Sequence, residues 1–400
     1  MAKLNVARVD LAGRRVFLRV DWNVPLKDGR VGDDTRITAT LPTVRHCLDQ
    51  GASVVIASHL GRPKGKPDPA FSLAPVADHL GGLLGRSVPL APDCIGPDAE
   101  RMARGLAAGD TLLLENLRFH AEEEANDEGF ARGLAALADL YVNDAFAAAH
   151  RAHASIEAIT HFLKPAVAGL LMSKELEALS RIFERPRPPL LAVLGGAKVS
   201  DKLALVEHLL EKVDGLLVGG GMAFTFLAAL GHDVGRSLLE QDRIEAARRV
   251  LDRARARGIA VRLPVDVVVA PSPDATAGVR TVSVREIPRD VMGLDIGQGT
   301  VAQFAAVLKG AGTVIWNGPM GVFEKTPFAA GTIGVGRAVA DSGCCSVIGG
   351  GDTIAAVQAA GVTGRIGYIS TAGGAFLEFL EGRVLPGVAA LTDAPPGEAA

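Results

Sequence analysis

Leu190-Leu-Ala-Val-Leu-Gly-Gly-Ala-Lys-Val-Ser-Asp-Lys202 joins an apolar run, a glycine turn and a polar segment that opens a helical pattern. A short, continuous apolar run is typical of a parallel strand that is covered on both faces. The same order of apolar run, turn and amphipathic segment recurs along most of the 400-residue chain. This alternation predicts an α/β fold with doubly wound parallel sheets of the Rossmann-like kind.

The other expected strands have the same short, apolar character. We expect strands at 16–20, 54–57, 112–114, 140–142, 216–218, 265–269, 314–316, 346–348 and 368–369. Apolar residues at helical spacing predict helices between them, for example at 38–49, 201–212 and 242–257.

A proline-rich segment marks the expected domain boundary. Residues 172–183 have the pattern of a helix, and Arg-Pro-Arg-Pro-Pro at 185–189 would end it. Because 400 residues exceed one ordinary core, two domains are expected. We expect an N-terminal substrate-binding domain over 1–170, a connecting hinge helix over 171–187, a nucleotide-binding domain over 188–385 and a C-terminal tail over 386–400.

The composition excludes several classes of protein. A net charge of -3 gives no global basic character, so we expect no nucleic-acid partner. No stretch approaches the ~20 apolar residues of a membrane helix, and no apolar signal region is apparent. The four cysteines contain no Cys-x-x-Cys pair, which argues against a disulfide framework. We therefore expect a cytoplasmic protein without a membrane partner.

Polar and basic side chains follow the expected strands of the first half. Ligands of open parallel sheets bind beyond the carboxyl ends of the strands, so these side chains should share one edge. Singly, each could be a surface arginine or a structural histidine. Together, cations that converge on one edge would repel each other unless an anion lay among them. A small-anion site is predicted at this edge, and its candidates are Asp21, Asn23, Arg36, His59, Arg62, Arg118, Asn143, Asp144, His150, Arg151 and His153.

Glycines follow the strands of the second half instead. Backbone N–H groups in such turns can close around nucleotide phosphates. Lys198 and Lys202 follow the first glycine turn, and their spacing predicts that both ammonium groups lie on one helix face. Two cations at a helix start oppose the helix dipole, which makes sense if phosphates occupy the turn. The order of residues is not that of a Walker A loop.

A second glycine turn precedes a helix expected to open at Ile354. Gly350 and Gly351 should offer N–H groups to phosphate, and Asp352 is the best-placed carboxylate for Mg²⁺. Asp352 and Thr353 could instead form a plain helix N-cap. Asn317 and Glu324 are polar residues of another turn that could contact a ligand, although a lone glutamate is usually a surface residue.

Several of these motifs together resemble the phosphoglycerate kinase family. They keep the family's order and spacing over nearly the whole chain, and include Arg19-Val-Asp-Trp-Asn-Val-Pro25, Ser58-His-Leu-Gly-Arg-Pro-Lys-Gly65, Leu114-Glu-Asn-Leu-Arg-Phe119, His150-Arg-Ala-His153, Gly195-Gly-Ala-Lys-Val-Ser-Asp-Lys202, Trp316-Asn-Gly-Pro-Met-Gly321 and Gly349-Gly-Gly-Asp-Thr353.

The resemblance implies a two-lobed glycolytic kinase. Its reaction would be phosphoryl transfer between ATP and the carboxylate of 3-phosphoglycerate, giving ADP and 1,3-bisphosphoglycerate, on hinge closure of a monomer. Of the anion-site residues, the resemblance assigns 3-phosphoglycerate binding to Asp21, Asn23, Arg36, His59, Arg62, Arg118 and Arg151. Arg36 and Lys198 would stabilise the phosphoryl group during its transfer. By motif position, the nucleotide would be held by Lys202, Asn317, Glu324, Gly350, Gly351, Asp352 and Thr353, with Mg²⁺ on Asp352.

Some positions depart from the family pattern. The family usually has glycine where Ala372 stands, serine where Phe376 stands and proline where Gln298 stands. The alternative of a nicotinamide-dependent dehydrogenase shares the α/β pattern, but Gly334-Val-Gly336 lacks a third glycine at Val339. A non-enzymatic anion-binding protein would have no evident need for the paired lysines.

Overall fold

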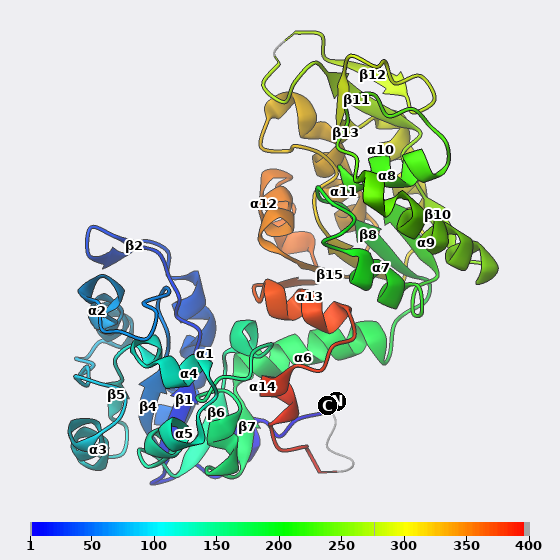
Figure 1. Cartoon of the computed structure of the whole chain (residues 1–400). Coiled ribbons are helices and arrows are strands. Elements are labelled where there is room, and N and C mark those ends of the chain that lie inside the picture. The colour runs from blue at the N-terminus through cyan, green and yellow to red at the C-terminus, as the bar shows by residue number, and fades with distance from the viewer. Residues whose placement is uncertain (1, 276, 396–400) are drawn as a thin grey trace. The chain divides into compact units, whose positions relative to one another are not determined.

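The computed structural model describes residues 2–275 and 277–395 (Figure 1). The chain divides into two compact units. The first unit comprises Met1–Glu177 together with the segment from Val384 onward, and the second comprises Ala178–Arg383. The boundary between Glu177 and Ala178 falls inside helix α6 (Leu170–Phe183). Among the described residues, no helix has both the length and the apolar character that crossing a membrane requires.

The first unit is built on a five-stranded parallel sheet. Its strand order is β5-β4-β1-β6-β7, with β1 at Arg15–Arg19, β4 at Ser53–Ala57, β5 at Thr111–Leu113, β6 at Leu140–Asn143 and β7 at Ala166–Ala168. Nearly every residue of these strands is buried, as continuous apolar runs predict. The helices of this unit include α1 (Thr35–Asp49), α2 (Ala74–Leu84), α3 (Pro97–Arg104), α4 (Ala121–Glu124) and α5 (Glu128–Ala135), and β2 (Leu26–Lys27) and β3 (Arg30–Val31) form a small hairpin.

The second unit contains a six-stranded parallel sheet and a smaller antiparallel one. The parallel order is β10-β9-β8-β14-β15-β16, with β10 at Ala260–Arg262, β9 at Gly215–Val218, β8 at Leu190–Leu194, β14 at Thr313–Asn317, β15 at Cys345–Gly349 and β16 at Tyr368–Ser370. The helices include α7 (Leu203–Leu209), α8 (Met222–Ala229), α9 (Ile244–Ala256), α10 (Gln298–Leu308), α11 (Ala330–Asp341), α12 (Gly351–Ala359) and α13 (Gly374–Leu380).

One expected strand belongs to a different kind of sheet. The strand expected at 265–269 is β11 (Asp266–Ala270), which pairs antiparallel with β12 (Arg280–Ser283) and β13 (Met292–Ile296). Its burial alternates over the first residues, because one face packs inward and the other is more open. The expectation of a parallel strand is therefore wrong here, while the position of the strand is confirmed.

Helix α6 begins against a buried carboxylate at the end of β6. Asp144 Oδ1 accepts a hydrogen bond from Met172 N–H at 2.9 Å. Burial raises the pKa of Asp144 to about 6, although hydrogen bonds from Thr43 and from the α6 backbone oppose the rise. A Cβ at Gly169 would lie 2.2 Å from Asp144 Oδ1, so only glycine fits beside it.

The expected C-terminal tail joins the edge of the first unit's sheet. It contains the short helix α14 (Pro386–Ala389), and Leu4 N–H then donates to Thr392 O at 2.9 Å. Thr392 N–H donates in turn to Ala166 O of β7 at 2.8 Å, and Ala394 N–H donates to Ala2 O at 3.0 Å. Residues 396–400 of that tail lie outside the described residues.

Candidate active site

The polar side chains of the first half lie at the carboxyl end of the first unit's parallel strands. Asp21 and Asn23 follow β1, and His59 and Arg62 follow β4. Arg118 lies in the short helix η3 (Leu117–Phe119), which follows β5. Arg151 follows β6, and Arg36 lies in the first turn of α1. We call these seven residues the basic site.

Asp21 holds one basic group of this site and lies near the ring of His59. Arg36 Nη1 donates to Asp21 Oδ2 at 2.5 Å, and His59 Nε2 lies 3.7 Å from Asp21 Oδ1. Asn23 Oδ1 accepts a hydrogen bond from Gly61 N–H at 2.9 Å. Asp21 thus fixes the guanidinium of Arg36 while leaving the side chain 39% exposed for a ligand.

The arginines differ in how firmly they are held. Arg118 is buried, donates from Nη1 to Gly61 O at 2.9 Å and pairs through Nε with Glu124 at 3.3 Å. Burial lowers its pKa, assisted by neighbouring guanidinium groups. Arg151 Nε contacts His150 Nε2 at 3.1 Å, whereas Arg62 is exposed. The basic site therefore combines fixed cations with accessible ones.

A buried layer beneath the basic site was not predicted. Arg19, fully buried in β1, donates from Nε to Ser155 Oγ at 2.8 Å and contacts His59 Nδ1 at 3.2 Å. Glu123 is also fully buried, accepts from Ser155 Oγ at 2.6 Å and lies 3.9 Å from Arg19 Nη2. Burial raises the pKa of Glu123, and the charge of Arg19 opposes that rise. The sequence did contain one indication of this layer, because Arg19 interrupts the apolar run of residues 16–20.

Two imidazoles of this region, those of His59 and His153, have pKa values below the physiological range. Burial holds the pKa of His59 well below its usual value, and the charges of Arg19 and Arg118 add to the effect. Burial and the same two guanidinium groups lower the pKa of His153 to about 3. The positive charge is thus carried by arginines, which suit forked contacts with carboxylate or phosphate.

The second unit holds a cavity of about 510 Å³ built largely from glycines and apolar side chains. Glycine turns after β8 and β9 form part of its wall. Gly220 has φ +65°, and a Cβ there would lie 2.7 Å from both Gly196 N and O. Phe224, Leu238 and Met320 add an apolar lining. We call this cavity the glycine-rich pocket.

Lys202 lies next to Gly196, a lining residue of this pocket, and Lys198 is not on the same helix. Helix α7 begins at Leu203 with Lys202 as its N-cap, and Lys198 lies before it outside any helix. The prediction of one shared helix face is therefore wrong, because the turn formed by Lys202 N–H and Val199 O delays the helix. Lys202 Nζ donates to Asn317 O at 2.9 Å, and burial lowers its pKa to about 8. Lys198 is exposed.

The other predicted nucleotide residues gather on the β14 and β15 turns. Helix α12 opens at Gly351 rather than at Ile354, so Asp352 and Thr353 lie in its first turn and Gly350 is the N-cap. Asn317 Nδ2 donates to Gly349 O at 2.6 Å, and Thr353 Oγ1 accepts from Gly318 N–H at 2.7 Å. Glu324 and Asp352 are exposed and line the glycine-rich pocket. The N-cap alternative is thus wrong for Asp352.

The three residues that depart from the family pattern lie at or just before the starts of helices α10 and α13. Phe376 is fully buried in α13, and a Cβ at Gly349 would lie 2.4 Å from its ring. Ala372 is buried before that helix, and its N–H donates to Ser370 Oγ at 3.3 Å. Gln298 is the first residue of α10, where a proline would also fit.

Comparison with known proteins identifies the family. Residues 6–383 match the family model described as Phosphoglycerate kinase. The chain belongs to the phosphoglycerate kinase family. The proteins named Phosphoglycerate kinase from Pelotomaculum thermopropionicum and Moorella thermoacetica are each 54% identical to it over 393 residues, which is 98% of this chain and 100% of each relative.

Solved structures of phosphoglycerate kinase share the fold. The structure from Coxiella burnetii is 43% identical, with a TM-score of 0.92 over 97% of this chain and 98% of that chain. The structure from Pyrococcus horikoshii OT3 is 37% identical, with a TM-score of 0.81 over the same shares. The chain therefore has phosphoglycerate kinase activity, a glycolytic phosphoryl transfer to a carboxyl group with ATP and ADP as nucleotides. Family membership sets aside the dehydrogenase alternative.

Proposed function

We propose that the two units divide the phosphoglycerate kinase reaction between them. The basic site of the first unit binds 3-phosphoglycerate, and the glycine-rich pocket of the second binds ATP or ADP. The observation that carries this assignment is the pair of sites itself: converging arginines over a buried Arg19–Glu123 layer in one unit, and a glycine-walled cavity beside Lys202 in the other.

The chemistry of 3-phosphoglycerate fits the basic site. The molecule carries a phosphate and a carboxylate, and guanidinium groups bind both by forked, charge-assisted hydrogen bonds. His59 and Asn23 add neutral polar groups beside the arginines. We assign the binding of 3-phosphoglycerate to Asp21, Asn23, Arg36, His59, Arg62, Arg118 and Arg151.

The nucleotide fits the glycine-rich pocket for different reasons. Its apolar lining suits a flat base, and the exposed Glu324 carboxylate can accept hydrogen bonds from ribose hydroxyls. Gly350 and Gly351 begin α12, where N–H groups and the helix dipole favour phosphate. Lys202 adds a cation, and the side chains of Asn317 and Thr353 hold the turns in place.

The residues present fit a Mg²⁺ ion bound with the nucleotide. Asp352 offers an exposed carboxylate in the first turn of α12, beside the glycines proposed to meet the phosphates. Mg²⁺ prefers one or two carboxylates together with phosphate oxygens. When bound, it would neutralise charge on the phosphates; Asp352 would hold it.

No residue needs to act as a general base. The acceptor is a carboxylate, which is ionised at neutral pH because its reference pKa is about 4. The chain's own contribution is then positioning and charge stabilisation, as in other phosphoryl transfers. We assign Arg36 and Lys198 to the transferring group, since both are accessible cations.

Two variants, each expected to lose affinity for one substrate and keep affinity for the other, test the assignment of the two sites. Arg118→Gln should weaken 3-phosphoglycerate binding by about tenfold or more while ATP affinity stays within twofold, because a charge-assisted hydrogen bond contributes about 1.5–3 kcal/mol. Lys202→Ala should do the reverse. Isothermal titration with each substrate measures both affinities. Arg101→Gln is the matched control, since that arginine is exposed and pairs with Asp98 at the surface.

The opposite result, in which Arg118→Gln loses ATP binding and keeps 3-phosphoglycerate binding, contradicts the assignment.

We further propose that hinge bending around α6 closes the units on both substrates, which would exclude water as a competing nucleophile. Adding both substrates should lower the radius of gyration in solution scattering. The same measurement tests the proposed monomeric state, and cell fractionation tests the proposed cytoplasmic location.

A further inference from the structure

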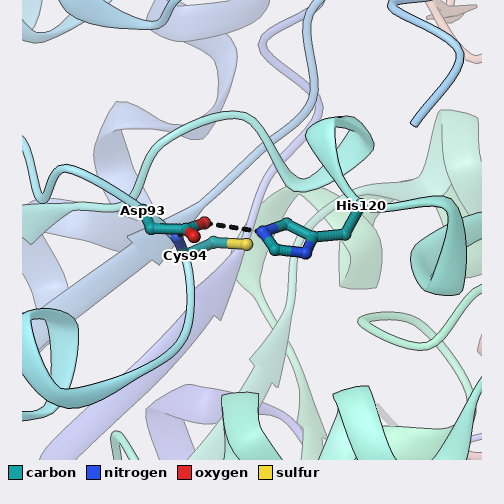
Figure 2. Close-up of side chains that lie close together, drawn as sticks. All are labelled: Asp93, Cys94 and His120. Atoms are coloured by element: carbon teal, nitrogen blue, oxygen red, sulfur yellow. Dashed lines mark hydrogen bonds and ion pairs between the residues drawn. The ribbon is translucent and has the colours of Figure 1, made fainter. Parts of the chain in front are cut away.

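Three metal-ligating side chains meet in the first unit outside the basic site. Asp93 and Cys94 lie in the segment between α2 and α3, and His120 is the N-cap of α4. One donor atom from each of the three lies within 4.8 Å of the other two (Figure 2). None of the three is among the residues assigned above to the substrates or the transferring group.

The cluster is held in place by its own contacts. Asp93 Oδ1 accepts from Cys94 N–H at 2.6 Å and lies 2.7 Å from His120 Nε2. The His120 ring packs against the Phe130 ring with centroids 5.1 Å apart, and His120 N–H donates to Leu117 O at 3.2 Å. Cys94 is fully buried, whereas the side chains of His120 and Asp93 are 24% and 48% exposed.

The directions of the side chains fit a shared cation better than a nucleophilic triad. In a triad, the imidazole uses one nitrogen for the nucleophile and the opposite nitrogen for the carboxylate. Here the Cys94 sulfur and the Asp93 carboxylate lie on the same side of the His120 ring (Figure 2). All three groups therefore face one point, as ligands of a single ion do.

A cavity gives this point access to solvent. A cavity of about 390 Å³ is lined by Asp93 and His120, and Asp68 and Glu115 contribute acidic groups to its wall. Glu115 is already engaged, because it accepts hydrogen bonds from Ser72 Oγ and from Leu73 N–H. It would therefore attract a cation without replacing one of the three ligands.

We propose that Asp93, Cys94 and His120 bind a divalent transition-metal ion of the Zn²⁺ type. One sulfur, one nitrogen and one oxygen form a donor set that suits Zn²⁺, whereas Mg²⁺ and Ca²⁺ prefer oxygen ligands alone. To form bonds of about 2.0–2.3 Å to one ion, Asp93 Oδ1 and His120 Nε2 would give up their 2.7 Å contact and move slightly apart, while the Cys94 sulfur moves in. Binding forms a metal–thiolate bond and releases the Cys94 thiol proton to solvent. A fourth position faces the cavity and is open to water.

Cobalt titration tests this site directly, because Co²⁺ occupies zinc sites and a thiolate ligand gives it a near-ultraviolet charge-transfer band. The probe is Co²⁺ alone, added to the reduced, untagged full chain without nucleotide. We expect the band to saturate at one equivalent, to disappear on adding Zn²⁺ and to survive excess Mg²⁺. Cys94→Ser should abolish it, and the matched Cys344→Ser variant, which alters a thiol of the second unit, should keep it.

His120→Gln covers the case in which Cys94→Ser fails to fold. It keeps every thiol and alters a partly exposed residue. Mutating a residue that only hydrogen-bonds to a metal ligand already lowers metal affinity roughly tenfold, so loss of the His120 ligand should lower Co²⁺ affinity by more than that. Absence of the band in the unaltered chain, or a band unchanged in His120→Gln, would overturn the proposal. Loss of the band in Cys344→Ser would overturn it as well. The proposal stands or falls independently of the substrate assignments, since no substrate is present.

Discussion

The two candidate sites occupy the same place on similar sheets but are built from opposite materials. The basic site uses charged side chains that rest on buried charges, as in the pairing of Arg19 with Glu123. The glycine-rich pocket uses close-packed backbone, as at Gly220, where a Cβ would meet Gly196 at 2.7 Å. The first should therefore be sensitive to loss of charge, and the second to gain of volume.

The largest expected effect comes from removing the buried charge under the basic site. Glu123→Gln leaves Arg19 buried without its carboxylate, and breaking a buried pair in this way costs about 3–5 kcal/mol. The free energy of unfolding, measured with urea, should fall by about that amount. Glu122→Gln changes the exposed neighbour and should stay within about 0.5 kcal/mol. Equal losses of stability in the two variants would show that the buried Arg19–Glu123 pair does not support the basic site.

The next effect is on turnover. Lys198→Ala should lower kcat by on the order of 10²-fold or more, because it removes a preorganised charge from the transferring phosphoryl group. A coupled assay of ADP formation measures it. Lys212→Ala removes an exposed lysine elsewhere in the second unit and serves as the control. Near-normal kcat in Lys198→Ala would sink its assignment.

A smaller effect should follow from adding one methyl group to the glycine-rich pocket. Gly220→Ala combines strain at φ +65° with overlap against backbone atoms, so we expect about 1–3 kcal/mol of lost stability and at least tenfold weaker ATP binding. Gly231→Ala has a similar positive φ but open space around the new Cβ, and it separates strain from overlap. If both variants bind ATP alike, backbone packing does not shape the pocket.

The smallest effect concerns the buried carboxylate of Asp144, where the rise in pKa caused by burial is only partly offset by the charge of Lys174. The pKa of Asp144 in the folded chain is about 6, above its ordinary 3.8, so the folded state holds the proton more tightly. Its contribution to stability is full below pH 3.8 and is lost as the pH rises through about 6.

Asp144→Asn should therefore gain stability relative to the unaltered chain between about pH 4 and pH 7, by on the order of 1–3 kcal/mol. Urea unfolding at several pH values measures the difference. A difference that does not change with pH would show that Asp144 is stabilised as an anion after all.

The sequence predicted the strands well because continuous apolar runs leave little choice of structure. The strand at Leu190–Leu194 lies where it was expected, and the glycine turn after it is confirmed. The sheet partners were harder: pairing is decided by residues far apart in sequence, and so β11 was assigned to the wrong kind of sheet. The alanine-rich β7 (Ala166–Ala168) was missed because three small residues give almost no pattern.

The sequence indicated the candidate site residues themselves, but it did not indicate the buried residues that hold them in place. Arg118 and Asp352 came from motifs at strand ends, which topology brings to one edge. Glu123 lies in a run of three glutamates that looks like a solvated surface, and only the fold shows that one of them is buried. The cluster of Cys94 and His120 has no spacing motif, since its residues come from separate segments.

The path of the last described residues has a consequence for synthesis. Thr392 bridges Leu4 and Ala166, so the edge of the first unit is completed by the end of the chain. A ribosome releases segments in order, and domains usually fold as units when all their parts have emerged. The whole of the second unit, Ala178–Arg383, must therefore leave the ribosome before the first can close its edge. The unit that begins first is completed last.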